Sequence, residues 1–200
     1  MARILPIILL VSLATPLLGQ ERGSAELRPV PAAEAARRVA STRDFVTDLL
    51  WLNTDPYWHK GEWEECLRLA RQVVELDPHF VEAYTGAAWM LWSMDRDEEA
   101  IALYQAGLAA NPDDHQIPHE FGLYYAYRKH WDKAAEQFRK SVARGAPMYH
   151  QHMLPNALYR AGRKEEALAE WRAILARFPG DAVARWRIEA LEKELAQEGD

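Results

Sequence analysis

Apolar and small residues recur at helical spacing through the middle of the chain. Each of two runs between residues 81 and 114 places such side chains on one helical face. The first run comprises Tyr84, Ala87, Ala88 and Leu91, and the second comprises Ala100, Leu103, Tyr104, Gly107 and Leu108. A polar turn at residues 95–97 separates the runs, and Asn111-Pro112 ends the second. The pattern predicts a hairpin of two helices, neither of which buries its apolar face alone.

The same unit recurs at nearly fixed spacing along the chain. Its small residue appears in four copies, separated by 34, 34 and 33 residues, at Cys66, Ala100, Ala134 and Ala167. Prolines end the units at Pro78, Pro112, Pro147 and Pro179. In three copies an aromatic residue stands four positions after the small one, at Tyr104, Phe138 and Trp171, whereas the first copy has Ala70. A helix, a tight turn and a second helix at this period predict a repeat array.

This spacing resembles the tetratricopeptide repeat over residues 47–181. The helix ends at residues 76–78 and 110–112, and the sequence FGLYYAY at residues 121–127, match that family's pattern. The resemblance implies an all-α, right-handed superhelical solenoid of about four hairpins plus a C-terminal capping helix. The units are expected at about 47–80, 81–114, 115–147 and 148–181. Pro56 and Pro155 depart from the pattern, and each is predicted to kink or shorten its helix.

The two ends of the chain lie outside these units. Residues 1–19 combine Arg3, an uncharged apolar run and small residues, which is typical of a secretory signal peptide, with an uncleaved membrane anchor as the alternative. Residues 20–40 are predicted to be a linker with a short leading helix, and residues 41–44 are expected to cap the first long helix, 45–59. Residues 182–200 are predicted to be the capping helix and tail, with an apolar face of Val183, Trp186, Ile188, Leu191 and Leu195.

Composition narrows the class of protein. With 49% hydrophobic and 27% charged residues, the sequence favours one elongated all-α domain. A net charge of −6 without a basic stripe argues against nucleic-acid binding, because the phosphate backbone requires clustered Lys and Arg. The single cysteine, Cys66, permits no internal disulfide, and its place in the repeat predicts a packed thiol.

No catalytic motif is found in the sequence. It has no glycine-rich phosphate loop, no paired cysteines and no recognisable nucleophile triad, so an enzyme and a resident cofactor are not expected. His115 and His119 stand at i and i+4, with His150 and His152 in the next unit, so four imidazoles could converge on a metal. Pro118 interrupts the first pair, which favours histidines that are solvated or hydrogen-bonded.

The remaining candidate is the concave surface that the resemblance implies. In the best-defined unit, Trp89 and Trp92 point about 130° away from the core face of their helix. Shifting by the repeat period extends this surface to other units. The predicted groove residues are Trp51, Asp55, Trp58, His59, Trp89, Trp92, His119, Tyr127, His152, Asn156 and Tyr159.

Four tryptophans on one wall exceed what solvation requires, and rigid aromatic side chains dominate binding hot spots. The main hypothesis is therefore an exported, periplasmic or secreted, scaffold that binds a peptide or helix of a partner protein, with a basic partner residue near Asp55. A sugar or porphyrin ligand, or a histidine metal site in the same groove, is the alternative, and a metal-dependent enzyme is third. The tryptophans could also pack on neighbouring helices or be covered by residues 32–40, which would leave no groove. Contact with a membrane is expected only through the N-terminal segment.

Overall fold

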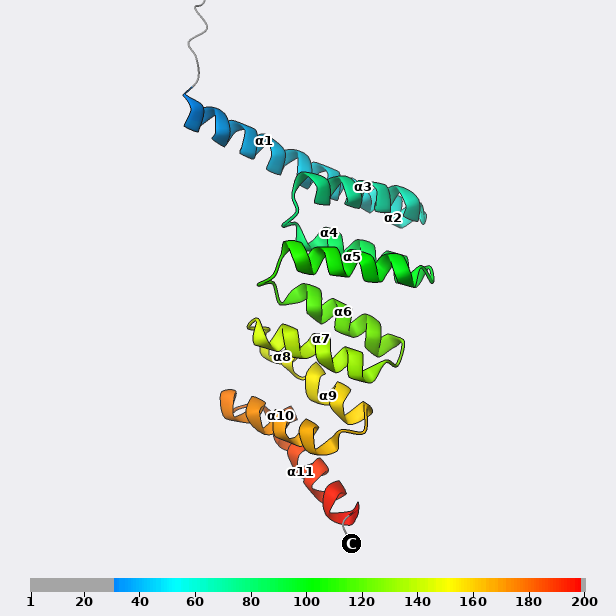
Figure 1. Cartoon of the computed structure of the whole chain (residues 1–200), viewed down its shortest axis with the longest axis vertical. Helices are drawn as coiled ribbons and strands as arrows, with labels where there is room; N and C mark the ends of the chain where they lie inside the picture. Colours follow the sequence, from blue (N-terminus) through cyan, green and yellow to red (C-terminus); the bar gives the residue numbers. More distant parts are fainter. Residues whose placement is uncertain (1–30, 199–200) are drawn as a thin grey trace, which may run out of the picture.

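The computed structural model describes residues 31–198, and every element within that range is a helix. The predicted signal peptide and most of the predicted linker lie outside the described residues. Figure 1 shows an elongated stack of helices, from α1 at one end to α11 at the other. The helices are α1 (Ala32–Leu52), α2 (Thr54–Lys60), α3 (Trp63–Leu76), α4 (Val81–Ser93), α5 (Asp97–Ala110), α6 (Gln116–Tyr127), α7 (Trp131–Ala143), α8 (Met148–Gln151), α9 (Met153–Arg160), α10 (Lys164–Arg177) and α11 (Ala182–Glu198).

These helices form four successive hairpins and a final helix. α4 packs against α5, and α6 packs against α7, as the apolar periodicity predicts. In the outer two units the first helix is broken, so α1 and α2 pair with α3, and α9 pairs with α10. α11 packs on α10 and covers the end of the array. The all-α repeat fold predicted from the sequence is confirmed. Among the described helices, none is both long and apolar enough to cross a bilayer.

The small residue of each unit allows its two helices to approach closely. Cys66, Ala100, Ala134 and Ala167 are fully buried, as are the residues four positions later. Gly122 serves the same purpose, because a Cβ atom there would lie 2.5 Å from the Phe138 ring. The thiol of Cys66 is packed as predicted, with burial raising its pKa.

The two prolines shorten their helices rather than bend them. The breaks fall at Asn53 and His152, and Pro56 and Pro155 each become the third residue of the helix that follows. Pro118 holds the same position in α6. The first N–H groups of a helix have no intrahelical acceptor, so a proline in the first turn sacrifices no hydrogen bond. A helix break three residues before the proline therefore avoids the loss of a backbone hydrogen bond that a proline inside a helix causes.

The predicted start of the first long helix is wrong. α1 runs without interruption from Ala32 through residues 41–44, so the short leading helix and the first helix of the array are one helix. The hydroxyl of Thr42 donates to the Arg38 carbonyl at 2.8 Å, one turn back, instead of capping. A Ser or Thr hydroxyl can either cap a helix N-terminus or donate to a carbonyl one turn back in the same helix, and Thr42 does the latter. Because α1 is continuous, it does not fold back over the tryptophans.

The capping helix is present, but its buried face differs from the prediction. Leu191 is buried and Ile188 and Leu195 pack against the core, whereas Val183 and Trp186 are exposed and Ala184 is buried in their place. The start of α11 is set by Asp181, whose carboxylate accepts hydrogen bonds from the N–H groups of Val183 and Ala184. That cap fixes which side of α11 meets α10.

Candidate interaction groove

Five aromatic side chains form a continuous row across the first three units. We call this the aromatic row, and its members in spatial order are Trp63, Trp58, Trp89, Trp92 and Tyr127. Successive ring centroids are 4.9, 5.2, 6.0 and 4.9 Å apart. These separations are typical of favourable aromatic pairs. Part of the ring surface of the row is open to solvent, because Trp58 is 37% exposed and Trp89 is 41% exposed.

A hollow of about 580 Å³ lies beside the row, between the α1–α2 segment and α4. Its lining includes Trp51, Trp58 and Trp89, and the small residues Gly86 and Cys66 leave the space between them. Trp51 is half-buried, with its ring 5.6 Å from that of Phe80 and its far edge against Gly86. The walls of the hollow are therefore formed by large, rigid aromatic side chains.

One carboxylate lies at the rim of this mostly apolar hollow. Asp55 belongs to the first turn of α2, and its side chain is exposed. His59, one turn later, places its Nε2 atom 3.4 Å from the carboxylate. Such an exposed pair contributes little to stability. Asp55 therefore remains accessible to a basic group on a ligand.

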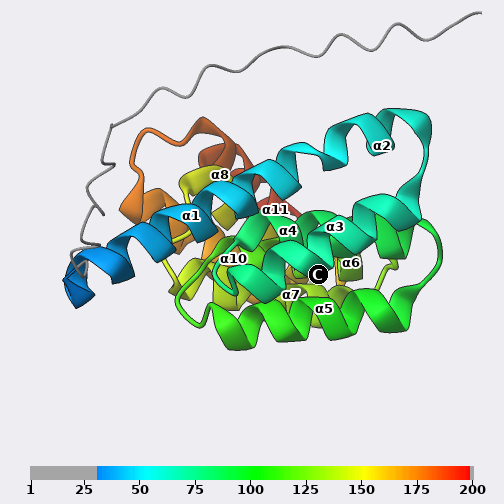
Figure 2. The ribbon, with the colours of Figure 1, turned by 90° about the horizontal axis from the view of Figure 1, so that it is seen from above.

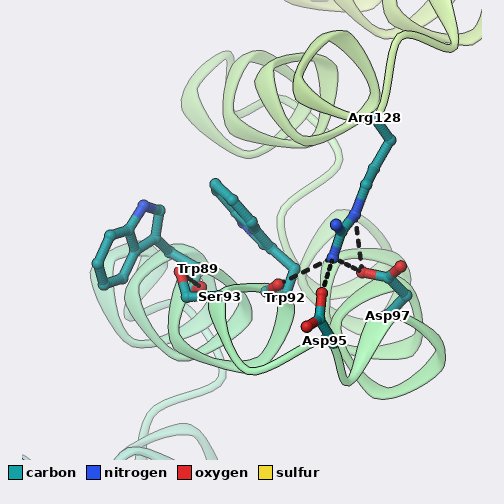
Figure 3. A network of polar contacts seen from close by, with 6 residues as sticks. All are labelled: Trp89, Trp92, Ser93, Asp95, Asp97 and Arg128. Carbon is teal, nitrogen blue, oxygen red and sulfur yellow. Dashed lines mark hydrogen bonds and ion pairs between the residues drawn. The ribbon is translucent and has the colours of Figure 1, made fainter.

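The far end of the row is held by Arg128. Figure 3 shows its guanidinium reaching from the end of α6 to the turn between α4 and α5. It donates to the Trp92 carbonyl at 3.0 Å, to Asp97 at 2.7 Å and to Asp95 at 3.1 Å. Because one of these bonds goes to the backbone of Trp92 itself, Arg128 positions this part of the row.

The same kind of bond links the other units. Arg96 bonds Glu64 of the preceding unit at 2.7 Å, and Arg163 bonds Asp132 at 3.3 Å. The sequence analysis did not predict these bonds between units. Arg96 and Arg163 each stand four residues before the small residue of their unit, and that shared position was the available signal.

His119 is not on the groove wall, so the prediction for this residue is wrong. It is buried, and its ring stacks on that of His150 with centroids 3.6 Å apart. His115 lies at the edge of the same cluster, 5.8 Å from His150. The Nδ1 atoms of all three are buried without a hydrogen-bond partner. Burial, and then the neighbouring imidazoles, lower the pKa of His119 to about 4.

The predicted groove residues of the fourth unit are engaged by α11. His152 Nε2 lies 2.6 Å from an oxygen of Asp181, so this side chain ties α9 to the start of α11. Burial alone would raise the pKa of Asp181, but hydrogen bonds from Ala184 and His152 hold it below its usual range. Asn156 and Tyr159 line a separate hollow with Arg187 of α11, and the Tyr159 hydroxyl lies 3.3 Å from Glu194. The candidate groove therefore comprises Trp51, Asp55, Trp58, His59, Trp89, Trp92 and Tyr127.

The four central histidines do not meet at one point. His115, His119 and His150 cluster, whereas His152 turns away to Asp181. Within residues 31–198, no three His, Cys, Asp or Glu side chains are placed to hold a metal ion. The geometry therefore gives no support to a histidine metal site in the groove.

The repeat geometry agrees with a family-level comparison. A sequence model of the tetratricopeptide repeat matches residues 57–117, which run from α2 into α6. The chain contains tetratricopeptide repeats. BBS4 of Bos taurus, a BBSome complex member, is 29% identical over 83 residues, which cover 42% of this chain but only 16% of BBS4.

Solved structures share the fold of this chain at low sequence identity. TTC0263, a thermophilic tetratricopeptide-repeat protein of Thermus thermophilus, has a TM-score of 0.53 and 20% identity, covering 72% of this chain and 80% of that one. PilF of Pseudomonas aeruginosa has a TM-score of 0.58 and 15% identity, covering 78% and 72%. Such solenoids present extended concave surfaces to other proteins, so the fold indicates an interaction scaffold.

Proposed function

We propose that this protein is a non-enzymatic scaffold that binds a peptide or helix of a partner protein in the candidate groove. The observation that carries the proposal is the hollow of about 580 Å³ beside the aromatic row. Its size falls within the range of roughly 300–1,000 Å³ typical of small-molecule pockets, so one large apolar side chain fits in it. Exposed indole surface next to a hollow is the arrangement in which a few residues supply most of the binding energy.

The chemistry of the groove defines the partner segment. Apolar walls at Trp51, Trp58 and Trp89 fit an apolar side chain as the anchor, and the carboxylate of Asp55 at the rim fits a Lys or Arg beside it. The partner segment is therefore apolar at one position and basic nearby.

A peptide accounts for the groove better than a flat ring does. The rings of Trp58 and Trp89 already contact one another, with centroids 5.2 Å apart and planes inclined by 37°. A sugar or porphyrin inserted between them would have to separate this pair. An anchor side chain enters the hollow beside the row and leaves the pair intact.

The proposed setting is the periplasm or the extracellular space. This part of the proposal is supported by the sequence of residues 1–19 alone, with its apolar run after Arg3. Fractionation of the producing cells and sequencing of the mature N-terminus test it. Recovery of the protein only in the cytoplasm contradicts export.

A displayed peptide library supplies the ligand for a direct test. Peptides selected on the protein are ranked by affinity, and the best is titrated against the parent, Trp58→Ala, Trp89→Ala and Trp186→Ala. Trp186 is the matched control, because it is an exposed tryptophan on α11, far from the groove. Loss of a hot-spot tryptophan costs about 2 kcal/mol or more, which corresponds to roughly 30-fold weaker binding.

The selected sequences and the variants give separate readings. The proposal predicts that the selected peptides share an apolar anchor with a nearby Lys or Arg, and that selection on Asp55→Lys loses the preference for the basic residue. It also predicts weaker binding by Trp58→Ala and Trp89→Ala and unchanged binding by Trp186→Ala. Circular dichroism melts of each variant show whether it is folded. If the folded groove variants bind as tightly as the parent, the peptide does not occupy the groove and the proposal fails.

A further inference from the structure

The first helix carries an apolar face that points away from the array. Phe45, Leu49 and Leu52 recur at i, i+4 and i+7, on the side opposite the buried Thr47. Phe45 is 65% exposed and Leu52 is 69% exposed. Val39 and Val46 are also exposed, on a flank roughly 100–120° around the helix from Phe45. We call Phe45, Leu49 and Leu52 the α1 outer face. A helix that is apolar on two opposite sides is typical of a helix buried on both sides.

The position of this face in the repeat array explains its composition. It occupies the side of the first unit on which a preceding unit would pack. The end of a solenoid must be polar or covered for the protein to stay soluble. Single exposed apolar residues are ordinary, but a contiguous patch marks an interaction site. The α1 outer face therefore has the character of an interface.

We propose that the α1 outer face binds the same face of a second copy of this chain, with the two α1 helices antiparallel. The charges along α1 carry this choice of partner. Its N-terminal half carries Arg37 and Arg38 against Glu34 and is net positive, and its C-terminal half carries Asp44 and Asp48 against Arg43 and is net negative. An antiparallel pair sets the basic end of each helix against the acidic end of the other. A parallel pair sets arginine against arginine.

A two-fold axis at Phe45 satisfies both the apolar and the charged positions. The two Phe45 rings meet at the axis, and Leu52 lies opposite the methylene groups of Arg38 of the second copy. Asp48 is one helical turn before Leu52 on the same flank, within reach of that guanidinium. Among the described residues, the Arg38 guanidinium bonds the exposed Glu34 at 2.5 Å, and an exposed pair of this kind is readily exchanged.

The shape of the molecule leaves room for this pairing. The 21 residues of α1 extend for about 31 Å, and its N-terminal half projects past α3 (Figure 1). Viewed from above, α1 lies across the end of the array (Figure 2). Two copies joined through α1 would form one longer array with the candidate grooves at either side of the junction. Because the pairing uses one helix from each copy, we expect a weak dimer that dissociates in dilute solution.

Sedimentation velocity of the full chain over a wide concentration series tests the pairing. The parent is expected to shift from monomer to dimer as concentration rises. Phe45→Glu combined with Leu49→Glu is expected to remain monomeric, because it places four carboxylates at the axis. Val183→Glu is the matched control, because Val183 is an exposed apolar residue on α11, and it should dimerise like the parent. All the substituted side chains are exposed, and circular dichroism checks that the variants fold.

A charge exchange tests the antiparallel arrangement. Arg38→Asp and Asp48→Arg should each weaken the dimer about tenfold, and their combination should restore it, because every pair across the axis is then reversed. Oxidation of Phe45→Cys should join two chains, whereas Arg37→Cys should not. Cys66 does not interfere, because it is the only cysteine and is buried.

Several results would overturn the inference. A parent that is monomeric at every concentration excludes the second copy as the partner, and so does a dimer that survives the two glutamates. Failure of the exchanged charges to restore association rules out the antiparallel pair. Binding of the monomeric parent to anionic lipid vesicles, lost with the two glutamates, would assign the face to a membrane surface instead.

Discussion

Mild acid should destabilise the array through His119. The imidazole of His119 is buried against His150 and Phe138, and burial lowers its pKa from 6.5 to about 4. In the unfolded chain the same imidazole binds a proton near pH 6.5. Between these two values the unfolded state holds more protons, so the free energy of unfolding falls as the pH falls. The full difference corresponds to at most about 3 kcal/mol.

Other titrating groups with shifted pKa values also affect the pH window. His150 titrates in the same direction, because burial and the charge of His115 lower its pKa. Burial raises the pKa of Glu120, which therefore stabilises the fold as the pH falls and partly offsets the histidines. The pKa of Asp181 is held low, so its contribution is lost only at more acidic pH. Between pH 6.5 and about 4, the net loss of stability is expected to come from the histidines.

Urea denaturation followed by circular dichroism at a series of pH values measures the effect. His119→Leu removes the titrating group and keeps an apolar side chain of similar volume, so its stability should vary less with pH than that of the parent. Subtracting the stability curve of His119→Leu from that of the parent removes the contributions of Glu120 and Asp181, which both proteins share. His59→Gln is the control, because His59 is exposed on α2. If parent and His119→Leu lose equal stability between pH 6.5 and 4, His119 is not held neutral by burial and the reasoning is refuted.

Three further substitutions and one chemical probe test the packing of the array. Gly122→Ala should lower stability by about 1–2 kcal/mol in thermal melts, because the buried Phe138 ring cannot move aside and overpacking exceeds the gain in helix propensity. Gly86→Ala should be neutral or stabilising, because only the edge of the half-buried Trp51 lies near, at 3.1 Å; a larger loss than for Gly122→Ala would contradict this. Arg128→Gln should cost about 1–2 kcal/mol in urea denaturation, less in high salt, and an unchanged midpoint would mean that its bonds to Asp95 and Asp97 contribute nothing. The Cys66 thiol should react with a thiol reagent only as fast as the protein opens, and rapid labelling of the folded protein would contradict its burial.

The repeating core was predictable because it depends on local periodicity. Small residues at Cys66, Ala100, Ala134 and Ala167 identify where helices meet, and each needs information only from its own unit. The same holds for Trp89, whose direction follows from the core face of its own helix, and the repeat period then correctly placed Trp58 as an exposed side chain. Positions within a regular helix follow from about 100° of rotation per residue, and the prediction is reliable wherever the helix is regular.

The errors arose where the helices are irregular. Shifting by the repeat period placed His119 and His152 on the groove wall, but the fourth unit does not begin with one straight helix. The break at His152 creates the short α8, which brings His150 onto His119. The continuous α1 was missed because a Thr hydroxyl bonds a backbone carbonyl within a helix as readily as it caps one. A single sequence does not show which of these local choices prevails.

The inner surface differs between the two ends of the array. At the α11 end, His152 and Tyr159 of the inner surface bond Asp181 and Glu194 and so hold α11 in place. At the α1 end, the hollow, the exposed indoles of Trp58 and Trp89, and the α1 outer face lie within the first two units. The histidine cluster lies between α6 and α8, away from that hollow. Peptide affinity should therefore stay constant at mildly acidic pH while global stability declines, provided that the first units remain folded. A parallel loss of both would show that the groove depends on packing in the third and fourth units.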